Sequence, residues 1–324
     1  MNFKIATAAV FAAGLLVSGA PADAAEKEKP FKVILLGTGS PQPVLDRASV
    51  STMILAGGQK IIIDAGRRAF QRISHALGNG PGVRGKIGNM DKIFLTHLHS
   101  DHVQGIPDIF TTGFMIGRKG PLQVWGPPGT KSMMNHLAKA YAFDVMVRTA
   151  WGKNRPEAYK EVSMDIKPGF VWKSGGISVR AFLVDHKEIA PAYGYVIEYD
   201  GRKVVISGDT IYTPSVIKES MGADLLIHHV ADTSDKLMKK KPKRFKRIMG
   251  HHTWPHEIAK IMNQAKPKFT ALTHVLMFGT KSAKALAKIK KDTTLPVVMG
   301  QDLMEIMVSK NGTKVTKQGI ATTH

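Results

Sequence analysis

The sequence contains no cysteine among its 324 residues. This excludes disulfide bonds, and it excludes any metal site or catalytic nucleophile that depends on a thiolate. Any metal ion that the chain binds must therefore be held by histidine, aspartate or glutamate side chains. The chain is long enough for one large domain or two small ones.

Acidic residues are scarce relative to basic ones. The chain has 25 Asp and Glu against 46 Lys and Arg, which gives a formal net charge of +21. A surface this basic favours anionic partners such as phosphate or sulfate esters, polyanions or a membrane face. The same charge also serves solubility alone, so it does not by itself identify a partner.

The N-terminus lacks an apolar run long enough to span a membrane. The run Ile5 to Val17 is shorter than the roughly 20 residues that a spanning helix needs. It lies between Lys4 and the small residues Ala22-Asp23-Ala24, an arrangement typical of a cleavable secretory signal peptide. We predict a signal peptide over residues 1–24 with cleavage after Ala24, a linker over 25–30, and a periplasmic or secreted protein with no stable membrane anchor. An uncleaved anchor is the alternative.

Strand-like and helix-like patterns alternate through residues 31–324, for which we predict one domain. This alternation predicts an α/β fold in which sheets are covered by helices. Two apolar runs around Gly57-Gly58 predict a hairpin, and Asp200-Gly201 predicts a two-residue turn. The basic stretch Lys236 to Arg247 is predicted to be a solvated loop or a flexible lid that draws in an anionic substrate. Strands are predicted at 31–37, 50–56, 59–66, 91–97, 122–127, 177–186, 192–200, 202–210, 223–229, 268–274, 295–302 and 303–309, and helices at 67–77, 130–147, 255–265 and 282–290.

The stretch "THLHSDH", Thr96 to His102, carries three histidines and an aspartate directly after a predicted strand. His97 and His99 are two residues apart, so in an extended segment they point to the same side. Asp101 and His102 follow where the chain turns, so they approach from a second direction. This geometry suits two metal ions side by side, and histidine with carboxylate is the usual ligand set for zinc in a hydrolytic site. Three further ligand-type residues end predicted strands: His186, Asp209 and His274.

In this order the motifs resemble those of the metallo-β-lactamase superfamily of metal-dependent hydrolases. The resemblance implies a four-layered αββα sandwich with a site at the edge of two sheets. It also implies two zinc ions, with manganese or iron as alternatives. For Asp64 it implies a role in orienting a metal ligand. His97, His99 and His186 would hold the first ion, Asp101, His102 and His274 the second, and Asp209 would bridge both.

Within that superfamily the chain is similar to the ribonuclease Z and exported arylsulfatase-like branch. The similarity lies in "LLGTGSPQPVLDRASVS", "DHKEIAPAYGYVIE" and "HHTWPHEIAKIMNQAKPKFTALTH". The last stretch resembles a His-x-Thr box, in which the histidine assists phosphodiester cleavage. This implies a catalytic role for His251, with His252 as the alternative and Thr253 beside the substrate. Two residues of the early loop, Arg47 and Ser51, are candidates for substrate contact or for a structural role.

Two departures separate the chain from ribonuclease Z itself. In that enzyme a glutamate orients the box histidine, whereas here His229 stands at the matching place, with Asp232 as a substitute. Bacterial ribonuclease Z also carries a tRNA-gripping arm between the third and fourth motifs. Only 22 residues lie between His186 and Asp209, and two strands and a turn fill them. We therefore expect no tRNA substrate.

The expected activity is hydrolysis of a small anionic ester, phosphate or sulfate, by a hydroxide held between two metal ions, with Asp101 accepting a proton. A lactonase or another carboxyl-ester hydrolase of the same fold is the enzymatic alternative. A non-catalytic exported protein that binds polyanions is the alternative of another class. The sequence leaves open whether the chain forms a homodimer.

Overall fold

The computed structural model describes Met1 and residues 28–320, apart from 79–86, 88–89 and 152–155. Residues 2–24 of the predicted signal peptide and residues 25–27 of the predicted linker lie outside the described residues. Every helix in the described part of the chain is too short or too polar to cross a bilayer.

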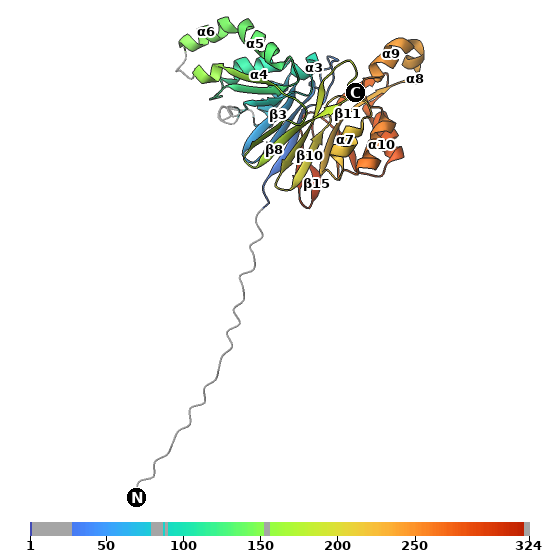
Figure 1. Ribbon diagram of the computed structural model, residues 1–324. Helices are drawn as coiled ribbons and strands as arrows, with labels where there is room; N and C mark the ends of the chain where they lie inside the picture. Colours follow the sequence, from blue (N-terminus) through green and yellow to red (C-terminus); the bar gives the residue numbers. More distant parts are fainter. Residues whose placement is uncertain (2–27, 79–86, 88–89, 152–155, 321–324) are drawn as a thin grey trace.

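Two mixed sheets form the centre of the fold (Figure 1). The first has eight strands in the order β15 (Gly312–Lys317), β14 (Met304–Ser309), β1 (Phe31–Gly37), β2 (Ser51–Ala56), β3 (Gln59–Ala65), β4 (Lys92–Phe94), β5 (Leu122–Gly126) and β6 (Glu161–Asp165). The second has seven strands in the order β13 (Val297–Met299), β12 (Thr270–Phe278), β11 (Leu225–Thr233), β10 (Arg202–Ile206), β9 (Ala192–Tyr199), β8 (Ile177–Val184) and β7 (Val171–Ser174).

Helices cover the outer face of each sheet (Figure 1). The first half contributes α1 (Ala69–Ala76), α3 (Ser100–Val103), α4 (Ile106–Gly113), α5 (Thr130–Ala140) and α6 (Ala142–Trp151), followed by a short 3₁₀ turn at Pro156–Tyr159. The second half contributes α7 (Pro214–Ser220), α8 (Asp235–Lys240), α9 (Pro242–Met249), α10 (Pro255–Ala265) and α11 (Ser282–Asp292).

Strand β1 shows why the sheets are covered on both faces. Val33 and Leu35 belong to the core between the two sheets, which also contains Tyr195 of β9 and Ile227 of β11. The alternate residues Ile34 and Leu36 belong to the core under α1, α4 and α5. Because successive side chains of a strand point to opposite faces, a continuous apolar run buries both faces at once. The predicted αββα sandwich is confirmed.

The hairpin and turn predictions are confirmed in detail. Strands β2 and β3 pair antiparallel around Gly57-Gly58, with Ala56 opposite Gln59. Asp200 and Gly201 have φ of 51° and 74°, the left-handed values that a tight hairpin between β9 and β10 requires.

Several predicted elements differ from the structure. The single helix over 130–147 is two helices, α5 and α6, because the chain leaves helical geometry at Tyr141. The predicted strands that end at His229 and His274 continue to Thr233 and Phe278. The loop prediction for Lys236 to Arg247 is wrong: this stretch forms α8 and most of α9, because Phe245 and Met249 of α9 are buried against β11 and β12.

Strand direction places the candidate site. β10, β11 and β12 run parallel to one another, and β8 is parallel to β10 because both are antiparallel to β9. The C-terminal ends of β8 and β10 therefore lie at the same edge of the second sheet. In the first sheet β3 and β4 are also parallel. Ligand-type residues that follow these strands are thus brought to one place.

Candidate metal centre

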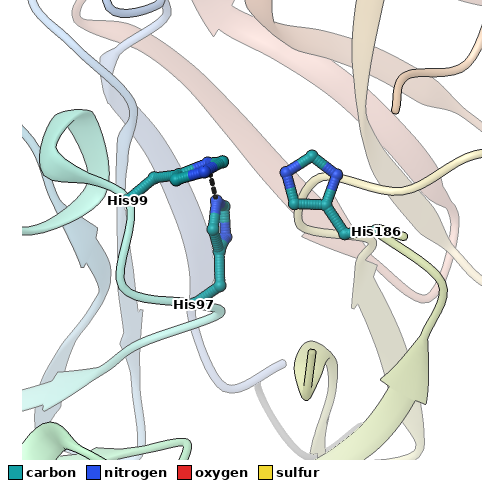
Figure 2. A group of neighbouring side chains, drawn as sticks. All are labelled: His97, His99 and His186. Atoms are coloured by element: carbon teal, nitrogen blue, oxygen red, sulfur yellow. Dashed lines mark hydrogen bonds between the residues drawn. The ribbon is translucent and has the colours of Figure 1, made fainter. Parts of the chain in front are cut away.

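The segment after β4 supplies four of the candidate ligands. Figure 2 shows His97 and His99 pointing toward one another from this segment, with His186 facing them from the loop after β8. His97 Nε2 lies 3.0 Å from His99 Nδ1. Asp101 and His102 follow in α3 and are buried. The turn into α3 gives the second direction of approach that the spacing predicts.

The candidate ligand atoms fall into four overlapping groups, and within each group they lie within 4.8 Å of one another. One group is His97, His99 and His186, and another is Asp101, His102 and His274. Asp209 belongs to the two remaining groups, with His97 and His102 in one and with His186 and His252 in the other. The structure therefore brings together all seven predicted ligands, with Asp209 adjoining both expected triads.

The carboxylate of Asp209 lies close to three histidine side chains. Its Oδ2 lies 3.3 Å from His274 Nε2, 3.5 Å from His102 Nε2 and 3.6 Å from His252 Nε2. The second carboxylate, Asp101, accepts a hydrogen bond of 3.0 Å from His274 Nε2. Both carboxylates are buried, so their negative charge is poorly screened by water.

His274 reaches the site through an irregularity in β12. The register between β11 and β12 shifts at His229 and Val230, and His274 opposite them has φ of 42°. A β-bulge of this kind redirects a side chain, and left-handed backbone in a histidine is uncommon. The strand can therefore continue to Phe278 while His274 turns toward Asp101 and Asp209.

Asp64 contacts the histidine segment, where the family resemblance implies a role in orienting a metal ligand. Its carboxylate accepts hydrogen bonds of 2.8 Å from the Thr96 amide, from the Thr96 hydroxyl and from His102 Nδ1. Since Thr96 Oγ1 donates to Asp64, it can accept from His97 Nδ1 at 3.0 Å. His97 and His102 therefore each carry a proton on Nδ1, which leaves Nε2 able to bind a metal ion. Asp64 has φ of 56°, so the backbone is strained where this contact is made.

Burial and charge shift the ionisation of the cluster in opposite directions. Burial lowers the pKa of His186 to about 4 and the pKa of His97 well below its usual range. Burial also disfavours charge on His102, but Asp64, Asp101 and Asp209 outweigh it and raise the pKa of His102 well above its usual range. Burial would raise the pKa of Asp209, but His274 and His102 hold it well below its usual range. The cluster thus combines neutral His97 and His186 with a positively charged His102 and ionised carboxylates, and a metal ion at His102 Nε2 would take the place of its proton.

These residues fit a pair of divalent metal ions. His102 Nε2 and His186 Nε2 are buried and have no hydrogen-bond partner among the described residues. Their other ring nitrogens are occupied, by Asp64 at 2.8 Å and by the His251 carbonyl at 2.9 Å respectively. Buried nitrogen lone pairs beside ionised carboxylates are the donor set of zinc, and also suit manganese or iron.

The His-x-Thr box lies beside this cluster. His251 accepts from His186 through its carbonyl, and its Nε2 lies 2.6 Å from the exposed carboxylate of Glu188. His252 points inward to Asp209. Thr253 is fully buried and donates its hydroxyl to the Thr210 carbonyl, so it supports the box instead of facing a substrate.

His229 joins two parts of the site, although it replaces the expected glutamate. Its Nδ1 donates to the Gly208 carbonyl at 3.0 Å, and its Nε2 accepts from the Thr253 amide at 2.9 Å. It therefore ties the loop that carries Asp209 to the box that carries His252. Asp232 does not take this place, because its carboxylate is bound by Lys288 Nζ at 2.8 Å.

A cleft of about 370 Å³ opens onto the cluster. The cleft is lined by candidate ligands, by both box histidines, by two arginines of α9 and by several apolar side chains. The lining residues are Pro41, Gln42, His99, Asp101, His186, Ile189, Asp209, Arg244, Arg247, Ile248, His251, His252, His274, Leu276 and Phe278.

The two substrate-contact candidates of the early loop lie elsewhere. Arg47 is buried and donates hydrogen bonds to Thr38 and to the Gly300 carbonyl. It borders a neighbouring cavity of about 490 Å³. Ser51 is fully buried where β2 begins. Neither residue lines the cleft, so the structure favours the structural alternative for both.

Comparison with known proteins gives a consistent result. A family profile described as "Beta-lactamase superfamily domain" matches residues 59–275. The chain is 34% identical to ribonuclease Z of Mycobacterium marinum over 75% of this chain and 86% of the relative. It is 32% identical to ribonuclease Z of Mycolicibacterium gilvum over 86% of this chain and 96% of the relative.

Two solved structures share the fold. The metallo-beta-lactamase fold protein YhfI from Bacillus subtilis aligns with a TM-score of 0.64 at 18% identity, over 86% of this chain and 99% of that one. The short form of human tRNase Z aligns with a TM-score of 0.61 at 21% identity, over the same shares.

Proposed function

The chain belongs to the metallo-β-lactamase superfamily, in its ribonuclease Z-like branch, and from this premise we propose that it is a phosphodiesterase that uses two metal ions. The observation that carries the proposal is the position of Asp209 between two groups of three candidate ligands. That arrangement suits two ions that share one carboxylate. The net charge of +21 supports an anionic ester as the substrate.

The residues around the cleft would have different roles in the reaction. When bound, two metal ions would lower the pKa of a water molecule and polarise the ester. Asp101, which faces the cleft, would accept a proton from that water. His251 would donate a proton to the leaving oxygen, held in place by Glu188 at 2.6 Å. His252 faces Asp209, so its place is among the ligands.

Initial rates on two esters test the proposal. The zinc-loaded protein is given bis(p-nitrophenyl) phosphate and p-nitrophenyl sulfate side by side, with a chelated sample as the blank. We expect chelator-sensitive turnover of the phosphodiester that exceeds turnover of the sulfate. Turnover of the sulfate alone would assign a sulfatase, and no turnover of either ester would favour a carboxyl-ester hydrolase. Either result contradicts the proposal.

We propose that tRNA is not the substrate. β9 and β10 with their two-residue turn occupy most of the chain between His186 and Asp209. Few residues remain there for the tRNA-gripping arm that the resemblance implies for bacterial ribonuclease Z, and this supports the proposal. A matched assay on a tRNA precursor with a 3′ extension checks this proposal, and cleavage comparable to that by a ribonuclease Z would contradict it.

We also propose that the protein is exported. The support is the order of Lys4, the apolar run Ile5 to Val17 and Ala22-Asp23-Ala24 in the sequence. Intact mass measured on protein expressed in a bacterium with its full N-terminus checks this. We expect a chain that begins at Ala25 in the periplasmic fraction, whereas a chain that retains residues 1–24 in the cytoplasm would refute export.

A further inference from the structure

Helix α9 forms one wall of the cleft and presents two arginines there. Phe245 and Met249 are buried, and the Phe245 ring packs against Phe278 with 5.3 Å between centroids. This packing fixes the rotation of the helix, so that Arg244 and Arg247 line the cleft. Residues three apart lie on one face of a helix, so both side chains leave α9 on the same face. The Arg244 guanidinium lies 5.7 Å from the centroid of the Phe245 ring.

The positive charge on this helix has no acidic counterpart. Within the described residues, neither Arg244 nor Arg247 forms an ion pair with a carboxylate, in contrast to Arg148, Arg180 and Arg202. Further cations of α8 and α9 surround them, and the stretch 235–249 contains a single acidic residue, Asp235. Two arginines that line a cleft and have no carboxylate partner among the described residues favour an anionic ligand group.

The surface next to the arginines is apolar. Ile248, Leu276 and Phe278 line the cleft beside them, with Pro41 and Ile189. A volume of about 370 Å³ is at the lower end of the range for small-molecule sites. The cleft therefore combines three features: candidate metal ligands, an apolar surface and a pair of arginines.

Resting on the proposed phosphodiesterase function, we propose that the substrate is a small phosphodiester with an apolar body and a second anionic group, and that Arg244 and Arg247 bind this second group. The scissile phosphodiester lies at the His/Asp cluster and the apolar body lies against Leu276 and Phe278. In the reaction, water adds oxygen to phosphorus, the P–O bond to the leaving alcohol breaks, and the alcohol oxygen takes up a proton.

Two synthetic diesters that differ by one carboxylate test this inference. They are p-nitrophenyl phenyl phosphate and p-nitrophenyl 3-carboxyphenyl phosphate, which release the same leaving group. For the zinc-loaded protein we expect a KM roughly tenfold lower for the carboxylated ester, as one charge-assisted hydrogen-bonded pair would give. We expect similar kcat values for both. In Arg244→Gln, Arg247→Gln and the double variant, the KM ratio should fall toward one.

A matched control separates a small dianion from a polyanion. Lys243 and Lys246 are exposed on the same helix but do not line the cleft. The double variant Lys243→Gln/Lys246→Gln should keep the wild-type KM ratio. Loss of the ratio in this control would instead favour a polyanion that runs across the helix, and equal KM values in the wild-type protein would overturn the inference.

Binding keeps the test independent of the proposed function. If neither ester is hydrolysed, the phosphodiesterase proposal fails. Calorimetric titration with 3-carboxyphenyl phosphate and phenyl phosphate then decides the inference alone. It stands if the carboxylated ligand binds more tightly and Arg247→Gln removes the difference, and it fails if both ligands bind equally.

Discussion

Asp209→Asn is expected to lower turnover of bis(p-nitrophenyl) phosphate by more than about 100-fold. Removing a residue that only hydrogen-bonds a metal ligand costs up to about 100-fold, and loss of a ligand itself should cost more. Asp209 approaches His102, His252 and His274 within 3.3–3.6 Å and belongs to two of the four ligand groups. The amide that replaces it is neutral and a poor ligand, so two bound ions would lose an anionic donor that they are proposed to share. Steady-state rates at saturating zinc measure the loss.

Asp185→Asn is the matched control for that variant. Asp185 lies next to His186, but its carboxylate is half exposed and accepts a hydrogen bond from the Lys187 amide. An asparagine can accept the same bond, so the rate should stay within about twofold of wild type. If Asp209→Asn retains wild-type turnover, the shared carboxylate has no role in the reaction.

Asp64→Asn is expected to weaken metal binding by about 10- to 100-fold without removing any ligand. The wild-type carboxylate accepts from His102 Nδ1 and from Thr96. An amide nitrogen at the Oδ2 position would face the Nδ1 proton of His102 and favour the other tautomer. That tautomer places the proton on Nε2, the atom that would bind metal.

Competition with a chromogenic chelator measures this change in affinity. Because the defect lies in orientation, high zinc concentration should restore much of the lost rate. Asp91→Asn is the control, since the Asp91 carboxylate pairs with Lys92 close to the surface and Asp91 directly precedes β4. Unchanged zinc affinity in Asp64→Asn would show that this contact does not orient His102 for metal binding.

The candidate site could be predicted from the sequence because its residues follow strands. His97 to His102 come directly after β4, and His186 and Asp209 come shortly after β8 and β10. Strand direction then brings these residues to one edge of the sheets. Predicting this requires only that the apolar runs are correctly assigned as strands. The buried strands β1, β2 and β3 were predictable for the same reason.

Other features depend on contacts between distant residues. The bulge that turns His274 into the site arises from pairing between β11 and β12, and no local pattern in "KFTALTH" indicates it. Helix α9 forms because Phe245 and Met249 find a buried surface, whereas its many lysines and arginines predict a solvated loop. Arg47 is a candidate for contact with an anionic substrate because it is a cation in a loop. Its hydrogen bonds to Thr38 and to the Gly300 carbonyl instead hold it in the interior.

The bonds of His229 illustrate the same limit. A motif comparison marks it as a departure from a glutamate, which predicts lost support for the box. The structure shows that both ring nitrogens are hydrogen-bonded, to the Gly208 carbonyl and the Thr253 amide, so His229 supports the backbone of the box instead of a histidine side chain. The position of His229 in the motif could be recognised from the sequence. The backbone groups to which it hydrogen-bonds could not, because they belong to distant parts of the chain.

The central claim is that the His/Asp cluster holds two metal ions that share Asp209. Elemental analysis of the purified protein, combined with zinc titration of the chelated sample while turnover is followed, tests it most directly. We predict two ions per chain and a rate that reaches its maximum only when the second ion is bound. A protein that binds one ion or none at full activity would contradict the claim.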